Sequence, residues 1–390
     1  MRVLHVTSGN LYGGVETFLT TLAREATLVP DMRSEFALCW EGRLSTELSQ
    51  FGTEPHVLGH VRLSRPHTVV RARHALRELL AREPFDVVVC HQPWPCVVFG
   101  SVVRAAGLPL VLWVHMAVEG KHWLERLARR ARPDLAICSS RFTAQCASRW
   151  LSQAQIEHVY CPVSRPDVAG CDTRAALRQR LDTPPRDVVI IQVSRLEAFK
   201  GQRELLHALA TIKDQQGWTC WLVGGPQRPS ETVYLRELQA IACAHKIDDR
   251  VRFLGERSDV PALLNAADVY CQPNWMPEAF GLSLVEALHA GLPVVTSGIG
   301  GACEIVNGLC GVLTPPGDAT ALSAALARLI ADDHFRAQLG AHARLRPYEI
   351  CDPTRQMRRI HELLASVHAV PPFGGPGPAD AGHYGFVKTD

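Results

Sequence analysis

Two cationic and two acidic side chains in the second half of the chain stand at positions that could serve a charged ligand. Arg195 and Lys200 occur in V-S-R-L-E-A-F-K-G-Q-R, directly after an apolar run. Two cations at the end of a strand are well placed to clamp a diphosphate, although a solvated loop would carry the same residues. Glu278 and Glu286 occur in P-E-A-F-G-L-S-L-V-E-A-L-H-A-G-L-P-V-V. Because a buried carboxylate is costly without partners, these glutamates need an explanation.

The glutamate stretch also contains an expected helix start. Gly281 and Leu282 begin the apolar helical pattern, where unpaired backbone N–H groups and the helix dipole attract a phosphate. Glu278 lies ahead of the helix and can accept hydrogen bonds from sugar hydroxyls. Glu286 lies inside the helix and can bind a vicinal diol such as ribose. The alternative for Glu286 is a surface position on an amphipathic helix.

The first half of the chain offers two weaker candidates. The first apolar run ends in S-G-N-L-Y-G-G-V-E-T-F-L, in which Gly13 and Gly14 precede a helical pattern. Glycines at such a turn let backbone amides approach an anion, but a plain tight turn has the same sequence. The spacing is not G-x-G-x-x-G, so the dinucleotide fingerprint is absent. His115 follows L-P-L-V-L-W-V and suits either a structural hydrogen bond or a substrate contact.

Alternating strands and helices must position these residues. Apolar runs predict strands over 3–7, 35–39, 86–90, 110–114 and 135–138, and again over 188–193, 219–223, 251–254, 269–271 and 293–296. Helical patterns lie between them, for example over 68–82, 202–212 and 282–290. Continuous apolar strands are typical of parallel sheets buried on both faces. The pattern therefore predicts an α/β fold of doubly wound sheets with right-handed crossovers.

The length and a break in this rhythm predict two domains. A chain of 390 residues, 47% of them hydrophobic, is too long for one ordinary core. We expect a Rossmann-like domain over 1–165, a linker over 166–186, a second Rossmann-like domain over 187–350 and a C-terminal segment over 351–370. Residues 371–390 are rich in Pro and Gly and are expected to be disordered. Two such domains leave a cleft where strand ends face each other.

Composition narrows the class of protein. A net charge of +2 gives no global field of the kind a nucleic-acid binder needs. The 13 cysteines are scattered, without a C-x-x-C pair, which favours reduced thiols in a cytosolic protein. The 17 histidines show no metal-ligand spacing, so no metal is expected. The first residues, M-R-V-L-H-V-T-S, do not form a signal peptide pattern.

A basic segment, K-H-W-L-E-R-L-A-R-R-A-R at 121–132, combines apolar residues with surrounding cations. As a helix it suits peripheral contact of Lys121–Arg132 with an anionic membrane. The alternative is a solvated helix packed on the sheet.

Short motifs in a fixed order carry a family resemblance. They are S-R-L-E-A-F-K-G at 194–201, L-V-G-G at 222–225, V-R-F-L-G at 251–255, A-D-V-Y-C-Q-P at 267–273, the two glutamate motifs, G-G-A-C-E-I-V at 300–306 and G-V-L-T-P-P-G-D at 311–318. In this order and spacing the chain resembles the family 4 glycosyltransferases of GT-B fold over about 1–367. The resemblance implies a last helix, near 354–366, that crosses back to the N-terminal domain.

The resemblance also implies site residues. The implied catalytic residues are His115, Arg195, Lys200 and Glu278. The implied donor-binding residues are Gly13, Gly14, Gly255, Glu256, Arg257, Phe280, Gly281, Leu282 and Glu286. The two cations would hold the donor diphosphate, the glutamates the sugar and the ribose, and residues 255–257 the base.

The implied activity is transfer of a hexose from a nucleotide sugar to a hydroxyl acceptor in glycan or glycoconjugate synthesis. Such enzymes retain anomeric configuration, and neither a metal nor a cofactor is expected. The family suggests a UDP-sugar first and GDP-mannose second as donor. The alternatives are a nucleotide-sugar 2-epimerase of the same fold, a non-catalytic nucleotide-sugar-binding subunit, and a glycoside phosphorylase or synthase. The expected location is the cytoplasm, with peripheral contact at the inner face of the membrane.

Overall fold

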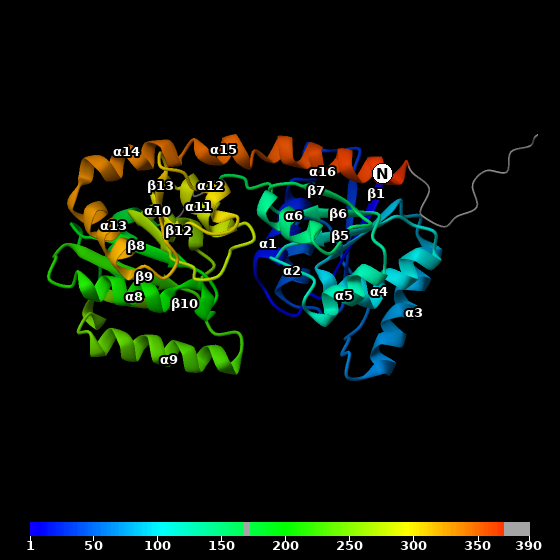
Figure 1. Cartoon of the computed structure of the whole chain (residues 1–390), viewed down its shortest axis with the longest axis horizontal. Coiled ribbons are helices and arrows are strands. Elements are labelled where there is room, and N and C mark those ends of the chain that lie inside the picture. The colour runs from blue at the N-terminus through cyan, green and yellow to red at the C-terminus, as the bar shows by residue number, and fades with distance from the viewer. Residues whose placement is uncertain (167–171, 370–390) are drawn as a thin grey trace, which may run out of the picture.

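Two parallel β-sheets, each flanked by helices, form the framework of the chain (Figure 1). The computed structural model describes residues 1–166 and 172–369. The first sheet has seven strands in the order β3-β2-β1-β4-β5-β6-β7, and the second has six in the order β10-β9-β8-β11-β12-β13. The predicted class, α/β with two Rossmann-like sheets, is confirmed. The expected disordered tail, 371–390, lies outside the described residues.

The first sheet and its helices occupy the N-terminal half. Its strands are β1 (Arg2–Thr7), β2 (Arg33–Leu38), β3 (His56–Val57), β4 (Val87–His91), β5 (Leu110–Val114), β6 (Leu135–Cys138) and β7 (Gln155–His158). Its helices are α1 (Gly14–Arg24), η1 (Ala26–Leu28), α2 (Arg43–Gln50), α3 (Pro66–Arg82), α4 (Pro93–Ala105), α5 (Trp123–Arg130) and α6 (Arg141–Ser148).

The second sheet repeats this alternation. Its strands are β8 (Val188–Val193), β9 (Trp218–Val223), β10 (Val251–Gly255), β11 (Val269–Gln272), β12 (Val294–Ser297) and β13 (Gly311–Thr314). The surrounding helices are α7 (Arg174–Arg180), η2 (Ala198–Lys200), α8 (Gln202–Thr211), α9 (Pro229–Ala244), η3 (Asp248–Arg250), α10 (Val260–Ala266), α11 (Leu282–His289), α12 (Ala302–Ile305) and α13 (Ala319–Ala331). Strands β3, β7 and β13, at sheet edges, were not predicted, because short edge strands lack a continuous apolar run.

The apolar strands are buried on both faces, as their sequences require. In β4 every residue is buried, and neighbouring residues belong to different core clusters. Val87 and Val89 pack with Phe18 of α1 on one face, whereas Val88 packs with Phe99 of α4 on the other. Burial on both faces fixes the sheet between its helices and therefore fixes the strand ends that carry the site.

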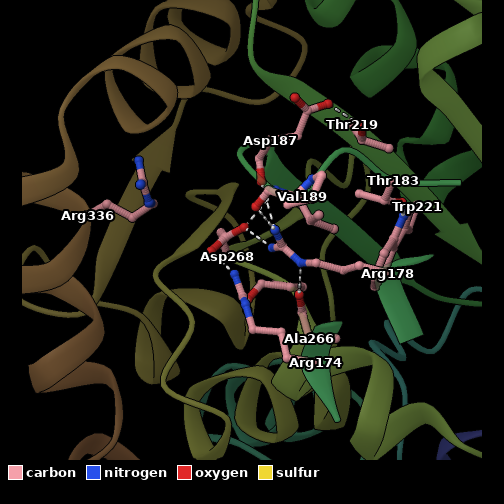
Figure 2. Close-up of polar contacts among 12 residues, drawn as sticks. Arg174, Arg178, Thr183, Asp187, Val189, Thr219, Trp221, Ala266, Asp268 and Arg336 are labelled. Atoms are coloured by element: carbon pink, nitrogen blue, oxygen red, sulfur yellow. Dashed lines mark hydrogen bonds and ion pairs between the residues drawn. The ribbon is translucent and has the colours of Figure 1, made fainter. Parts of the chain in front are cut away.

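The segment expected to be a linker contains helix α7, which is anchored to the second sheet (Figure 2). The guanidinium of Arg178 is buried and pairs with Asp268, which also accepts a hydrogen bond from the backbone of Val189 at 2.8 Å. The same guanidinium donates to the carbonyls of Ala266 at 2.9 Å and Asp187 at 3.0 Å. The charged residues that resemble a solvated linker therefore tie α7 to the starts of β8 and β11.

The C-terminal helices α14 (Asp333–Ala343), α15 (Arg346–Ile350) and α16 (Pro353–His368) run from the second unit along the first (Figure 1). Helix α16 contacts η1 and β4 of the first unit. Its Arg359 pairs with Glu157 of β7 at 3.1 Å. The amphipathic face of α16, with Met357, Ile360 and Leu364 buried, explains why it packs there.

Candidate active site between the two sheets

A cavity of about 600 Å³ lies between the two units, at the carboxyl ends of their strands. Of the residues proposed from the sequence, all but Gly255 line it: Gly13, Gly14, His115, Arg195, Lys200, Glu256, Arg257, Glu278, Phe280, Gly281, Leu282 and Glu286. Gly255 ends β10 and accepts a hydrogen bond at 2.8 Å from Gly224, which lines the cavity. A second cavity, of about 570 Å³ between β7 and α16, contains none of them.

The cations and Glu278 form one charged group. The Lys200 ammonium lies 2.5 Å from Oε2 of Glu278, and Arg195 pairs with Glu197 at 2.9 Å. Asn274 and Gln272 also donate to Oε2 of Glu278, at 2.9 and 3.2 Å. Burial raises the pKa of Glu278, but the charge and hydrogen bond of Lys200 outweigh it, and the pKa lies below its ordinary value.

Only one oxygen of Glu278 is used in this way. Its Oε1 makes no hydrogen bond within the described parts of the chain, 1–166 and 172–369, whereas Oε2 holds three. The carboxylate is therefore fixed by one oxygen and can accept ligand hydroxyls with the other. Gln272 and Asn274, which hold it, were missed from the sequence, although polar residues at the carboxyl end of a buried strand are a usable signal.

The start of α11 provides backbone donors. Gly281, the N-cap, has φ +101°, and a Cβ there would lie 2.8 Å from Leu284. Only glycine fits this turn without strain, and the turn leaves the first amides of α11 beside the cavity. Glu286, one turn further, is half-buried and makes no hydrogen bond to another described residue. Burial raises the pKa of Glu286, and Arg24 opposes this shift.

The glycine loop of the first unit faces the second unit directly. A Cβ on Gly13 would lie 3.5 Å from Nε of Arg195, and one on Gly14 would lie 3.7 Å from Leu282. Across the same opening, Arg43 pairs with Glu256 at 3.0 Å. Because Gly13 and Gly14 carry no side chains, the loop can lie close to Arg195 and Leu282 of the second unit.

His115 has both ring nitrogens in use. Its Nε2 lies 2.9 Å from Nδ1 of His91, and its Nδ1 lies 3.3 Å from Oγ of Ser139. Ser139 and Gln92 also line the cavity, and neither was proposed from the sequence. Gln92 has φ +82°, and its buried Oε1 has no partner among the described residues. Such strain in a non-glycine residue gathers at functional sites, and Gln92 follows a buried strand directly.

Comparison with known proteins identifies the family of the chain. Residues 12–165 match the family described as Glycosyltransferase Family 4, and residues 173–346 match Glycosyl transferases group 1. The chain therefore belongs to the family 4 glycosyltransferases, and its two facing sheets form a GT-B fold.

Relatives and a solved structure extend over most of the chain. It is 29% identical to a phosphatidyl-myo-inositol mannosyltransferase of Mycobacterium leprae, over 75% of this chain and 77% of that protein. It is 26% identical to a GDP-mannose-dependent alpha-(1-6)-phosphatidylinositol monomannoside mannosyltransferase of Mycolicibacterium smegmatis, over 90% and 95%. The crystal structure of Anabaena HepE in complex with UDP and glucose superposes with TM-score 0.81 at 26% identity, covering 94% of this chain and 100% of that one.

Within the described ranges no helix is both long enough and apolar enough to span a bilayer.

Proposed function

We propose that this protein is a retaining hexosyltransferase that uses a nucleoside diphosphate sugar. The observation that carries the proposal is the convergence of Arg195, Lys200, the first amides of α11 and Glu286 on one cavity. The Glu286 carboxylate has no hydrogen-bond partner among the described residues. The cations and amides suit the two phosphates, and Glu286 suits the ribose diol. Glu278, between these groups, suits the hydroxyls of the sugar.

A UDP-sugar is the first donor proposed and GDP-mannose the second. Support for the first comes from Anabaena HepE, whose structure contains UDP and glucose. Support for the second comes from the Mycolicibacterium smegmatis relative, which is described as GDP-mannose-dependent. The base would lie beside Glu256 and Arg257, and Arg257 is held in place by Asp259 at 2.6 Å.

The chemistry follows from where charge develops. Breaking the bond between sugar and diphosphate leaves negative charge on the diphosphate and oxocarbenium character on the sugar. Arg195, Lys200 and the start of α11 are preorganised to stabilise the leaving diphosphate, so neither a metal nor a cofactor is proposed. The acceptor hydroxyl would attack from the face that the diphosphate leaves, which retains configuration, and a phosphate oxygen would take its proton. Gln92, beside His115, is proposed to contact the acceptor.

A thermal-shift panel of UDP, GDP, UDP-glucose, UDP-galactose and GDP-mannose tests the donor. A ligand at about 100 times its Kd stabilises the folded state by about 2.7 kcal/mol, which is readily measured. We expect one base to give a clear shift and the other little. If no nucleotide raises the melting temperature at millimolar concentration, the proposed donor site is wrong.

Product analysis separates transfer from the alternatives. With donor and no acceptor, a transferase gives slow hydrolysis, an epimerase gives an epimeric nucleotide sugar, and a non-catalytic subunit leaves the donor unchanged. Formation of a glycoside with the α-configuration of the donor, on addition of lipid-linked or glycan acceptors, would support the proposal. An epimerised nucleotide sugar would contradict it.

We also propose peripheral membrane contact through α5. Trp123 is 51% exposed, Met116 is 48% exposed, and Lys121, Arg126 and Arg129 are exposed around them. An exposed indole within a cationic surface suits an anionic interface. We expect co-sedimentation with vesicles of anionic lipid at low salt, and loss of binding in Trp123→Ala. Equal binding to neutral vesicles, or none to either, would contradict the proposal.

A further inference from the structure

Three histidines from adjacent strands form a continuous chain of hydrogen bonds that ends at the cavity. Nδ1 of His5, in β1, lies 2.9 Å from Nε2 of His91, at the end of β4. Nδ1 of His91 lies 2.9 Å from Nε2 of His115, which follows β5. His115 continues the chain to Ser139, after β6. Of the three, the family resemblance implies a catalytic role only for His115, and the two buried histidines have no role in the proposed function.

Aromatic rings surround the histidines, and His5 and His91 are fully buried, whereas His115 borders the cavity. His5 stacks on Phe36 with ring centres 5.4 Å apart, and Trp113 stacks on His115 at 5.8 Å. Phe18 of α1 lies 5.2 Å from His115. Burial lowers the pKa of His5 and of His115 to about 3, so these rings are neutral at physiological pH. Burial also places the pKa of His91 well below its ordinary value.

A chain of neutral imidazoles has only two hydrogen-bond directions, because each ring has one donor and one acceptor nitrogen. At the cavity end, Oγ of Ser139 donates to the carbonyl of Val114 at 3.2 Å. That carbonyl can only accept, so Ser139 must receive the Nδ1–H of His115. At the other end, Nε2 of His5 is buried without a partner in the described part of the chain. A buried lone pair without a partner is tolerated better than a buried N–H.

The Ser139 end and the His5 end of the chain therefore favour the same direction of hydrogen bonding, in which Nδ1 of each ring carries the proton. We propose that His5 and His91 are positioning residues that fix His115 as a hydrogen-bond donor toward the bound sugar. The bond from His115 to Ser139 is long, at 3.3 Å, and both residues line the cavity. A sugar oxygen placed there can replace Ser139 as the acceptor. His115 cannot act as a base, because Nε2 is occupied by the N–H of His91.

The inference rests on the proposed function for the identity of the ligand. The tautomers of the three histidines can be measured without knowing that ligand. NMR of full-length protein labelled with ¹⁵N at histidine reports which ring nitrogen carries the proton. We expect protonated Nδ1 and bare Nε2 for His5, His91 and His115. A proton on Nε2 of His115 would overturn the inference, whether or not a nucleotide sugar binds.

Two substitutions of His5 test the consequence for activity. Asn can place a side-chain N–H near the position of Nδ1, whereas Leu fills the site without a donor. We expect His5→Leu to lower kcat/KM for sugar transfer about tenfold, the worth of one neutral hydrogen bond, with the Kd for the nucleoside diphosphate unchanged. We expect His5→Asn to restore most of that loss.

The exposed His74 of α3 provides the control, because His74→Leu should change neither kcat/KM nor the Kd for the nucleoside diphosphate. Wild-type kcat/KM in His5→Leu, or equal losses in the Leu and Asn variants, would overturn the positioning role. If His5→Leu does not fold, the NMR measurement of the histidine tautomers in the wild-type protein tests the inference. Failure of the donor panel would count against the proposed function and leave the NMR result standing.

Discussion

Lys200 and Glu278 form an ion pair in which each side chain is only 15% exposed. Removing two charges from water costs about as much as their attraction returns, so such a pair contributes little net stability. Glu197, Glu278 and Arg195 lie around the same loop, which concentrates charge where apolar residues would be more stable. Functional sites commonly carry this cost, and both residues of the pair line the cavity between the two units.

Lys200→Ala tests the role of the cation. We predict that kcat/KM falls at least a hundredfold, because removing one group that stabilises developing charge costs about 2.7–4 kcal/mol. Steady-state kinetics with the donor identified by the panel would measure this loss. Lys213→Ala, which removes an exposed lysine, should leave kcat/KM unchanged.

Loss of Lys200 also leaves Glu278 buried without its cation, which destabilises the fold. The double variant Lys200→Met/Glu278→Gln should recover stability but not activity. Near-wild-type activity in Lys200→Ala, or in the double variant, would contradict the assignment.

The proposed contact between Glu286 and the ribose can be tested by changing the ligand hydroxyl and the side chain in turn. We predict that wild-type protein binds UDP about tenfold more tightly than 2′-deoxy-UDP, the worth of one hydrogen bond to a charged acceptor. Glu286→Gln should bind both with similar affinity, measured by calorimetry. If the variant keeps the preference for the ribonucleotide, Glu286 does not contact the ribose. GDP and 2′-deoxy-GDP replace these ligands if the panel selects guanine.

The buried histidines should affect stability as the pH falls. Burial lowers the pKa of His5 and His115 from 6.5 to about 3, so between these values the unfolded chain binds protons that the folded chain does not. The free energy of unfolding therefore decreases as pH falls through this window, by up to about 1.4 kcal/mol per pH unit for each histidine. Denaturation of His5→Asn at several pH values should give a shallower slope. An identical slope would contradict the burial of a neutral His5.

At the scale of elements, helix α7 is held in place by two arginine side chains, Arg174 and Arg178. Helix α7 has only seven residues and would not be stable alone. Arg178 joins it to β8 and β11 through Asp268 and three backbone carbonyls (Figure 2). Helix α7, which lies in the chain between the two sheets, is therefore attached to the second sheet.

Arg178→Ala should be strongly destabilising. Asp268 keeps the more exposed Arg174 as a partner but loses its buried cation, so we expect the lower end of the roughly 3–5 kcal/mol that breaking a buried pair costs. We predict a loss of that size in denaturant unfolding, monitored by the near-UV signal of the buried Trp221 and Trp218 in the same unit. Arg180→Ala, on the exposed side of the same helix, should cost less than about 1 kcal/mol. Similar effects of the two substitutions would contradict this account of α7.

At the scale of the whole molecule, polar contacts join the two units beside the site. Glu304 of α12 accepts hydrogen bonds from the backbone of Arg141 at 3.0 Å and Phe142 at 2.8 Å, the first residues of α6. It also accepts from the hydroxyl of Tyr160 at 2.8 Å. Ser140 donates to the carbonyl of Ala279 at 2.6 Å, within the loop that carries Glu278. These hydrogen bonds therefore connect the start of α6 in the first unit to α12 and to the loop that carries Glu278 in the second.

Glu304→Ala should loosen this arrangement without unfolding either unit. We predict a larger radius of gyration in small-angle scattering and a higher KM for the donor, because binding must then also order the interface. A saturating nucleotide should bring the radius of gyration back toward the wild-type value. Glu362→Ala, on the exposed face of α16, is the control. An unchanged radius together with an unchanged KM would show that Glu304 does not hold the units together.

The sequence by itself determined the alternation of strands and helices and the two-unit α/β fold, and it predicted four charged residues of the candidate site in the second half. These features are local: buried parallel strands need continuous apolar runs, and a helix start needs residues such as Gly281 within a few positions. Arg195, Lys200, Glu278 and Glu286 each belong to a short motif in the sequence, and the cavity contains all four. The edge strand β7 and helix α7 were missed because their polar sequences resemble loops.

Only the tertiary structure decided which distant residues meet. The sheet places β1 between β2 and β4, so His5 reaches His91 across 86 positions of the chain. Glu304 likewise reaches α6 across 163 positions, a contact with no local sequence signal. Strand order and the docking of two units depend on the sum of many weak packing contacts over the whole chain. For that reason the sequence identified the charged residues of the candidate site, whereas the structure identified the histidines that contact His115 and the contacts between the two units.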